Sequence, residues 1–490
     1  MKTKITVSKS FPIAKIDKRI YGSFIEHLGR AVYGGIYEPS HETADDQGFR
    51  RDVLALVKQL GVPLVRYPGG NFVSGYQWMD GTGDKAKRPR RMELAWNAIE
   101  TNEVGIDEFQ EWAKRADSEV LMAVNLGTGT PQDAQSLVEY CNSETDTKYA
   151  AMRRENGFEK PFGIKTWCLG NEMDGPWQIG HKTAEEYGRI ATEAAKLMKR
   201  ADPSIELVAC GSSFYTMPTF GDWELTVLNH TYDYIDYISL HQYYGNQKED
   251  TKDFLGRAVQ MDAFIKSVAA ICDTVKAKKH SKKTVNLSFD EWNVWYRTLG
   301  EKHEGRRIAP PQLEEVYSFE DALLVGAMLI TLQNNCDRVK IACLAQLVNV
   351  IAPIMTENGG AAWAQTIFYP FMYASLCGRG TALRVATDSE SYQTSDGLCV
   401  PYLAASVIQD EEARTLTVFA VNRSLDEQIT LALDAQGFAG ATLERHIELY
   451  ADDLKAINSK EKSAVLPTQK AIDGTPTLQK HSWNMLVYKY

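Results

Sequence analysis

The sequence predicts a (β/α)8 barrel joined to an all-β sandwich, and two observations carry that prediction. Short apolar runs alternate eight times with longer amphipathic stretches before residue 360, which is the pattern of a parallel barrel with a helix after each strand. After about residue 380 short runs with period-two alternation are separated by turn-rich segments, as in antiparallel strands. We therefore expect a barrel domain over residues 18–375 and a sandwich formed by residues 1–17 and 376–490.

The eight barrel strands are expected where the chain is briefly and continuously apolar. They are Ile20–Glu26, Pro63–Tyr67, Val120–Leu126, Ile164–Leu169, Ile205–Cys210, Tyr237–His241, Val285–Asp290 and Lys340–Gln346. Helical spacing is found between them, for example in Phe49–Leu60, Thr183–Lys199, Phe254–Lys276 and Ser318–Asn335. A doubly wound open sheet would alternate in a similar way. However, no G-x-G-x-x-G follows the first strand and the units number eight, which favours the closed barrel.

The second domain is predicted from runs of alternating apolar and polar residues. These are Leu416–Val421, Gln428–Leu433, His446–Tyr450 and Trp483–Tyr490, with turns at Asn422–Glu427 and Asp434–Gly440. Lys4–Val7, near the start of the chain, also alternates and could add a strand to this module.

Charge and composition exclude several classes of partner. The net charge of −10, from 54 basic and 64 acidic residues, repels phosphate backbones and argues against nucleic acid. Residues 1–11 lack the apolar stretch of a signal peptide, and the longest apolar run, Ala322–Leu332, is far short of the ~20 residues that cross a bilayer. We therefore expect a cytoplasmic protein with no membrane partner. The eight cysteines form no C-x-x-C pair, and Cys168, Cys210 and Cys343 are expected to be small buried hydrophobes.

Polar side chains gather at one end of the predicted strands. They are Glu26-His27, Arg66 to Asn71, Asn125, Asn171-Glu172, His241 to Tyr243, Asp290 to Asn293, and Gln346. The active site of a (β/α)8 barrel lies at the carboxyl ends of its strands, and the opposite ends of these strands show no such pattern. The sequence therefore predicts a reactive site at this mouth.

Two of these residues, Glu172 and Glu291, suit cleavage of a glycosidic bond. Such cleavage needs one carboxyl to protonate the leaving oxygen and another to attack or stabilise the anomeric carbon. The two glutamates lie at the ends of the fourth and seventh predicted strands, so we expect them to face each other across the mouth. Asn171 could bind the sugar 2-hydroxyl. Metal-dependent hydrolysis is disfavoured, because there is no His-x-His at a strand end and no H-E-x-x-H.

Five motifs in order give the sequence a family resemblance. They are Gly22–His27 (GSFIEH), Arg66–Phe72 (RYPGGNF), Asn125–Gly129 (NLGTG), Trp167–Gln178 (WCLGNEMDGPWQ) and Asp290–Tyr296 (DEWNVWY). Together they resemble family 51 of the glycoside hydrolases, specifically the intracellular α-L-arabinofuranosidases, over about Tyr21 to Pro353. The resemblance implies an exo-acting, retaining enzyme with no cofactor, assembled as a homo-hexamer, that removes terminal arabinofuranosyl residues from oligosaccharides, arabinan or arabinoxylan fragments.

Residue roles follow from the resemblance. Glu172 would be the general acid/base and Glu291 the nucleophile. A subsite for the terminal arabinofuranose would be lined by Glu26, Arg66, Asn71, Asn171, His241, Tyr243 and Gln346, and the leaving-group side would be flanked by Trp96 and Trp295. The family varies in residue type at position 71, so the resemblance supports the role of Asn71 less strongly than the roles of the other subsite residues.

Each role has a competing structural interpretation. Arg66 could keep Glu291 ionised or form an ordinary salt bridge, and Tyr243 could orient the nucleophile or merely pack. His241 could be a core histidine, and the two tryptophans could be core residues. The activity also has alternatives: an endo-acting β-glucanase or xylanase would use a similar barrel with an open cleft, and a non-catalytic carbohydrate-binding barrel would usually lack one carboxylate.

Overall fold

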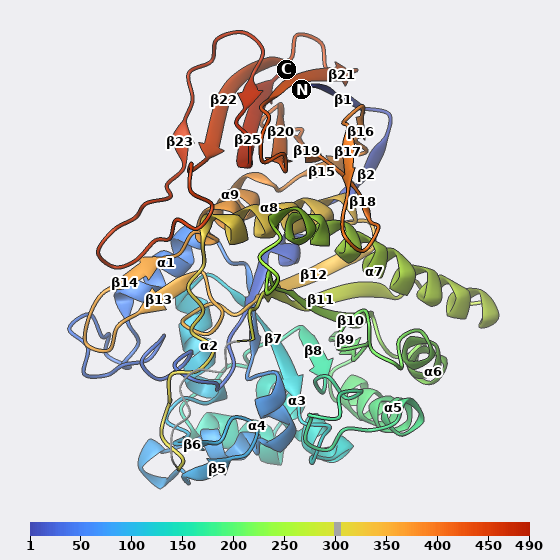
Figure 1. Cartoon of the computed structure of the whole chain (residues 1–490). Coiled ribbons are helices and arrows are strands. Elements are labelled where there is room, and N and C mark those ends of the chain that lie inside the picture. Colours follow the sequence, from blue (N-terminus) through green and yellow to red (C-terminus); the bar gives the residue numbers. More distant parts are fainter. Residues whose placement is uncertain (298–304) are drawn as a thin grey trace.

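The predicted barrel is confirmed by the computed structural model, which describes residues 1–297 and 305–490 (Figure 1). Eight parallel strands close into a ring in chain order. They are β3 (Gly22–Phe24), β4 (Leu64–Tyr67), β7 (Glu119–Val124), β8 (Thr166–Leu169), β9 (Glu206–Ala209), β10 (Tyr237–Tyr244), β11 (Asn286–Val294) and β12 (Val339–Ala345). Between β8 and β11 lie only β9 and β10, so residues at the ends of β8 and β11 face across the mouth.

A helix follows each barrel strand and covers the outside of the ring. The helices are α1 (Arg51–Leu60), α2 (Ile106–Arg115), α3 (Pro131–Asn142), α5 (Ala184–Ala201), α6 (Asp222–Thr231), α7 (Thr251–Lys278), α8 (Phe319–Asn334) and α9 (Phe368–Cys377), with α4 (Lys148–Glu155) added after α3. Local sequence sets where they begin. At α5 the Thr183 hydroxyl accepts from the Glu186 N–H, and the Glu186 carboxylate accepts from the Thr183 N–H, which is a capping box.

Two sheets form the sandwich that lies above the barrel in Figure 1. The larger has the order β2 (Pro12–Lys15), β15 (Thr381–Leu383), β19 (Leu403–Asp410), β20 (Thr415–Asn422), β25 (Ser482–Lys489), β22 (Thr442–Leu449) and β23 (Thr468–Gln469). The smaller has the order β16 (Ala386–Thr387), β1 (Lys2–Ser8), β21 (Ile429–Gln436) and β24 (Thr477–Leu478). Apolar residues of both sheets, among them Ile5, Val418 and Leu431, share one buried core.

The possible strand at Lys4–Val7 lies inside β1, which runs between β16 and β21. Its pairing with β21 is parallel, from Lys2 opposite Thr430 to Ser8 opposite Gln436. This parallel pair is an exception within a module that is otherwise antiparallel.

Helix α8 joins the two domains. Nearly all of its residues are buried, which is expected of a helix covered on both sides, and it contacts β19, β20 and β25 of the sandwich. Gly326 makes this close approach possible, because a Cβ at that position would lie 2.3 Å from Cδ1 of Trp483. The barrel and the sandwich are therefore packed directly against each other.

Three short two-stranded hairpins lie outside the barrel and the two sandwich sheets. They are β5 (Arg91–Glu93) with β6 (Ala98–Glu100), β13 (Ile354–Thr356) with β14 (Ala362–Ala364), and β17 (Ser391–Gln393) with β18 (Cys399–Pro401). Cys168, Cys210 and Cys343 are buried thiols, as expected. Of the helices in the described part of the chain, none combines the length and apolar character needed to cross a membrane.

Strand irregularities occur where the predicted site begins. The register of β10 against β11 shifts between Ser239 and His241, and that of β11 against β12 shifts between Phe289 and Trp292. In a regular strand consecutive side chains point to opposite faces, whereas a bulge re-aims them. Both Asp290 and Glu291 consequently reach His241.

Candidate active site

The structure brings the residues singled out from the sequence to one mouth of the barrel. They are Glu26 after β3, Arg66 in β4, Asn71 at the start of the 3-10 helix η2 (Asn71–Gly75), Trp96 in the β5–β6 hairpin, Asn171 and Glu172 after β8, His241 and Tyr243 in β10, Glu291 in β11, Trp295 after β11, and Gln346 after β12. Most of them are linked by hydrogen bonds, which form one group around Glu172 and Glu291 and a second group around Glu26.

Glu172 is directed into the mouth by a sharp turn at the end of β8. Gly170 has φ +92° and Glu172 itself has φ +45°, a left-handed conformation that is costly for a glutamate and is often found at functional sites. One carboxylate oxygen, Oε2, accepts from Trp177 Nε1 at 2.7 Å, and the other, Oε1, lies 3.1 Å from His241 Nδ1. Both carboxylate oxygens of Glu172 are therefore held by neighbouring side chains. The side chain is still 12% exposed, so a ligand in the mouth can reach it.

Glu291 is fixed by two donors from neighbouring strands. Its Oε1 accepts from Arg66 Nη1 at 2.7 Å, and its Oε2 accepts from the Tyr243 hydroxyl at 2.8 Å. Burial by itself lowers the pKa of Arg66, but Asp290 and Glu291 beside it outweigh burial and raise that pKa well above its ordinary value. Arg66 therefore stays cationic, and its hydrogen bond to Glu291 is charge-assisted.

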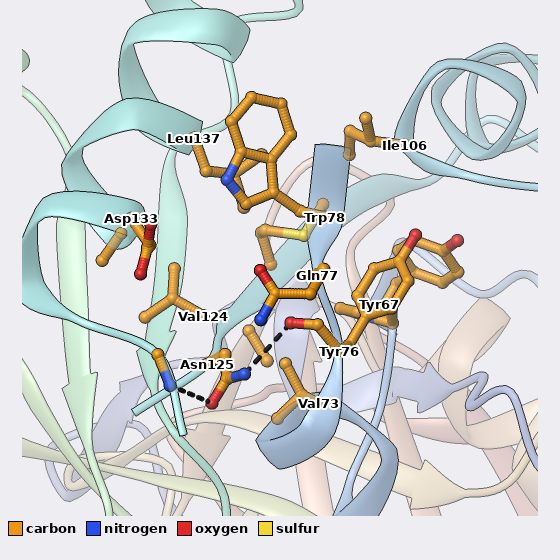
Figure 2. Close-up of a pocket in the computed structure, with 15 residues that line it drawn as sticks. Tyr67, Val73, Tyr76, Gln77, Trp78, Ile106, Val124, Asn125, Asp133 and Leu137 are labelled. Atoms are coloured by element: carbon orange, nitrogen blue, oxygen red, sulfur yellow. Dashed lines mark hydrogen bonds between the residues drawn. The ribbon is translucent and has the colours of Figure 1, made fainter. Parts of the chain in front are cut away.

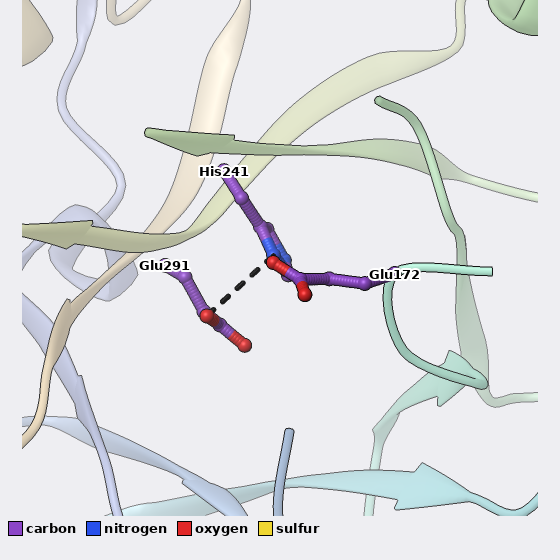
Figure 3. A group of neighbouring side chains, drawn as sticks. All are labelled: Glu172, His241 and Glu291. Carbon is purple, nitrogen blue, oxygen red and sulfur yellow. Dashed lines mark hydrogen bonds and ion pairs between the residues drawn. The ribbon is translucent and has the colours of Figure 1, made fainter. Parts of the chain in front are cut away.

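The two glutamates converge on a single point, with His241 between them (Figure 3). One oxygen of each carboxylate and one ring nitrogen of His241 all lie within 4.8 Å of one another. A divalent cation could in principle bind such a group. However, both oxygens of Glu291 already accept hydrogen bonds, one of them from a permanent cation, and that charge opposes a second cation. The arrangement suits two carboxylates acting on one ring rather than a metal centre.

Arg66 also organises the asparagines beside the pair. Its Nη2 donates to Asn171 Oδ1 at 2.7 Å, and Asn171 Nδ2 donates to Asn71 Oδ1 at 3.2 Å. A single planar guanidinium thus fixes both Glu291 and the amide next to Glu172, which a point-charge ammonium could not do.

Glu26 forms a second centre at the same mouth. Its Oε1 accepts from the Phe72 N–H at 2.9 Å and from Trp96 Nε1 at 2.8 Å, and its Oε2 lies 3.3 Å from Gln346 Nε2. A Cβ at Gly70 would lie 2.8 Å from Glu26 Oε2, so the turn after β4 needs a glycine to approach this carboxylate. Burial raises the pKa of Glu26 to about 8. The centre offers an acceptor for a sugar hydroxyl.

The aromatic residues at the mouth differ in what they contact. Trp96 and Trp295 are partly buried, and Trp295 packs edge-on against Tyr243 with 5.5 Å between ring centroids. Trp177, which sequence reasoning did not select, is 46% exposed and stacks on Phe214. Trp177 belongs to the same motif as Glu172, and that proximity in sequence was the one signal available for it.

Asp290 lies at the mouth, as its place at the end of the seventh predicted strand indicates, but the sequence assigned it no role there. It is 1% exposed and lies under the mouth, with Oδ1 3.0 Å from His241 Nε2 and Oδ2 3.9 Å from Arg66 Nε. Burial raises the pKa of Asp290, but Arg66 and His241 outweigh burial and lower it. Burial likewise lowers the pKa of His241, while Glu291, Asp290 and Glu172 raise it to about 10. His241 is therefore an imidazolium surrounded by three carboxylates.

Asn125 supports the mouth without reaching its chemistry. Its Oδ1 accepts from the N–H groups of Gly127, Thr128 and Gly129. Its Nδ2 donates to the Tyr76 carbonyl (Figure 2). It lines a separate, mostly apolar hollow together with Tyr76, Trp78 and neighbouring residues. Asn125 thus shapes the loop after β7 instead of binding ligand beside the two glutamates.

The chain is similar to known proteins along nearly its full length. Residues 56–263 match the family described as "Alpha-L-arabinofuranosidase 1 domain", and residues 290–482 match "Alpha-L-arabinofuranosidase C-terminal domain". An intracellular exo-α-(1→5)-L-arabinofuranosidase of Halalkalibacterium halodurans is 58% identical, with 98% of each chain covered. A Bacillus subtilis protein of the same description is also 58% identical, over 95% of this chain and 93% of its own. The solved structure of a family 51 α-L-arabinofuranosidase from Bifidobacterium longum superposes with a TM-score of 0.95 at 45% identity, covering 99% of each chain.

Proposed function

This chain belongs to the α-L-arabinofuranosidases of glycoside hydrolase family 51, and from that membership we propose that it removes terminal arabinofuranosyl residues with retention of configuration. The observation that carries the proposal is the convergence of Glu172 and Glu291 across the barrel mouth, with one oxygen of each within 4.8 Å. Retaining enzymes hold their two carboxyl groups about 5–5.5 Å apart, whereas inverting enzymes leave room for water at about 6.5–9.5 Å.

The reaction is a double displacement. Glu291 attacks the anomeric carbon while the Glu172 carboxyl protonates the departing oxygen, which gives an arabinosyl-enzyme ester. Glu172, now a carboxylate, then takes a proton from water as that water attacks the same carbon. Arg66 and Tyr243 orient the attacking carboxylate, since each donates to a different oxygen of Glu291.

The terminal sugar is bound by the remaining polar groups of the mouth. Asn171 and Asn71 form hydrogen bonds with hydroxyls on one side of the sugar ring. Glu26 and Gln346 form hydrogen bonds with hydroxyls on the other side. Trp96 and Trp295 flank the departing part of the substrate. These roles rest on the family resemblance, together with the hydrogen bond from Arg66 to Asn171 and those from Trp96 and Gln346 to Glu26.

The enzyme is exo-acting and prefers (1→5) linkages. Two relatives at 58% identity are described as exo-α-(1→5)-L-arabinofuranosidases, and the endo-acting glucanase or xylanase alternative has no comparable support. Release of arabinose from (1→5)-, (1→3)- and (1→2)-linked disaccharides measures the preference, and faster release from either of the other two would contradict it.

Two substitutions test the chemistry. Glu291→Ala should abolish turnover of every arabinoside, and near-normal activity would exclude it as the nucleophile. Glu172→Ala should spare aryl arabinofuranosides with good leaving groups far more than disaccharides, because aryloxide departs with little help from a proton. Equal losses on both substrates would exclude Glu172 as the acid.

Location and assembly are proposed from the same relationship. The relatives described as intracellular support a cytoplasmic enzyme, and the family resemblance supports a homo-hexamer. Sedimentation equilibrium of the purified protein checks the assembly, and a monomer or dimer would contradict it.

A further inference from the structure

A chain of three polar groups runs from beneath the barrel mouth to Glu172. Asp290 Oδ1 lies 3.0 Å from His241 Nε2, and the other ring nitrogen, Nδ1, lies 3.1 Å from Glu172 Oε1. Both contacts have hydrogen-bond length. Asp290 and His241 are 1% and 2% exposed, so bulk water does not readily exchange protons with the inner part of this chain.

The charges around His241 favour a proton on both ring nitrogens. The titratable and charged groups that contact the ring or its carboxylate neighbours come from β4, from β8 and the turn after it, and from β10 and β11. They are Arg66, Cys168, Glu172, Tyr243, Asp290 and Glu291. Three of the six are carboxylates in direct contact with the ring. Arg66 is the one cation among them, and it neutralises at most one negative charge. A neutral imidazole carries one N–H, so either Asp290 Oδ1 or Glu172 Oε1 would face a ring nitrogen without a hydrogen. Losing a hydrogen bond to a buried carboxylate is costly.

His241 Nδ1 also senses the nucleophile. It lies 3.6 Å from Glu291 Oε2, whereas Arg66 contacts the other carboxylate oxygen, Oε1. When Glu291 bonds to the anomeric carbon its negative charge disappears, because the carboxylate becomes an ester. The imidazolium then loses one of the charges that stabilise it, at the moment when the departing oxygen requires a proton.

We propose that Asp290 is a positioning residue that keeps His241 protonated, and that the proton destined for the leaving group is held on His241 Nδ1 until Glu291 attacks. This inference rests on the proposed function. In the step itself the Nδ1–H bond breaks and an O–H bond forms on Glu172. That O–H bond then breaks as the proton joins the glycosidic oxygen, which receives the electron pair of the breaking C–O bond. Deglycosylation returns a proton from water to Glu172, and from Glu172 to His241 as Glu291 regains its charge.

Asp290→Asn tests the proposal because an amide oxygen can still accept from Nε2–H while the charge is lost. The dependence of kcat/KM on pH is measured with an arabinobiose, whose departing oxygen needs a proton, and with 4-nitrophenyl α-L-arabinofuranoside. A charge within ~4–6 Å shifts a titration by about 1–3 pH units. We expect the alkaline limb for arabinobiose to move to lower pH by about one unit or more, with a smaller effect on the aryl substrate.

Matched variants separate this effect from damage to the fold. Asp107→Asn removes another buried carboxylate, one that accepts from the Tyr140 hydroxyl at 2.7 Å away from the mouth, and should leave the alkaline limb in place. His241→Gln should shift the limb as well, and adding Asp290→Asn to it should shift it no further. An alkaline limb of Asp290→Asn that coincides with that of the wild type would overturn the proposal, even if kcat/KM fell uniformly.

Neutron diffraction from crystals of the wild-type enzyme at neutral pH provides a check that needs no variant. Deuterium on both ring nitrogens of His241 and none on Glu172 is the expected result. Deuterium on Glu172 facing a bare Nδ1 would refute the stored proton. Failure of the wild type to release arabinose from any substrate would instead refute the proposed function.

Discussion

Replacing Arg66 by lysine measures how much the guanidinium contributes to catalysis. Arg66 donates at 2.7 Å to Glu291 Oε1 and at 2.7 Å to Asn171 Oδ1. A lysine ammonium in the same place keeps a positive charge but reaches only one of these acceptors well. The variant Arg66→Lys thus loses one charge-assisted hydrogen bond while the charge of the site is unchanged.

The size of the effect follows from that bond. Hydrogen bonds to charged groups contribute about 1.5–3 kcal/mol, and each 1.4 kcal/mol corresponds to about a tenfold change. If the lost bond orients the nucleophile in the transition state, kcat/KM for 4-nitrophenyl α-L-arabinofuranoside should fall about 10- to 150-fold. Initial rates at low substrate concentration give this ratio directly.

Arg19→Lys is a matched control at the opposite mouth of the same barrel. Arg19 donates to Glu206 at 2.6 Å and to Asp17 at 2.8 Å, so its replacement also removes a charge-assisted bond. Both variants should lower the melting temperature, but only Arg66→Lys should lower kcat/KM. The reasoning is refuted if Arg66→Lys keeps kcat/KM within about twofold of the wild type, or if Arg19→Lys loses as much activity.

Three further perturbations have distinct expected results. Tyr243→Phe, which removes a donor to the nucleophile, should lower kcat/KM about tenfold or more. Its control, Tyr244→Phe on the same strand, removes a buried hydroxyl that bonds to nothing in the described structure and should leave initial rates unchanged. Gly326→Ala should lower the melting temperature through overpacking against Trp483, at a cost of about 1–3 kcal/mol, while kcat/KM at low temperature is retained; an unchanged melting temperature would contradict the packing argument. Burial raises the pKa of Glu26 to about 8, so the stability that comes from its protonation is fully present below the unfolded pKa of about 4.3 and is lost as pH rises through about 8. The melting temperature of Glu26→Gln should therefore rise relative to that of the wild type between these two pH values. A difference in melting temperature that does not change with pH would exclude this contribution of Glu26.

The barrel was predictable because the strands are short and apolar, and nearly every one is followed by a polar group. This signal is local in sequence, and it was enough to predict the number of barrel strands and the end of the barrel at which Glu172 and Glu291 meet. The structure trims several strands, for example Ile20–Glu26 to the three residues of β3, because hydrogen-bonded pairing ends before the polar residues turn into loops. Strand β19 was not predicted, although it pairs along its whole length with β20, since its apolar residues do not alternate regularly.

Asp290 could not be assigned from sequence for a geometric reason. A regular strand would point Asp290 and Glu291 to opposite faces, and only the shifted register between Phe289 and Trp292 lets both reach His241. A bulge of this kind depends on pairing with neighbouring strands, which leaves no clear local pattern. Trp177 was missed because a loop residue gives no periodicity from which its direction can be inferred.

The position of β1 has a consequence for how the chain is synthesised. A ribosome releases residues 2–8 before the barrel, yet the strand beside which they run in parallel, β21, spans residues 429–436. The barrel is translated in between, and nascent chains generally fold domain by domain from the amino terminus. The first strand must therefore wait, unpaired, while a whole domain forms beside it, and its exposed edge during that interval is a point at which chaperones or aggregation could intervene.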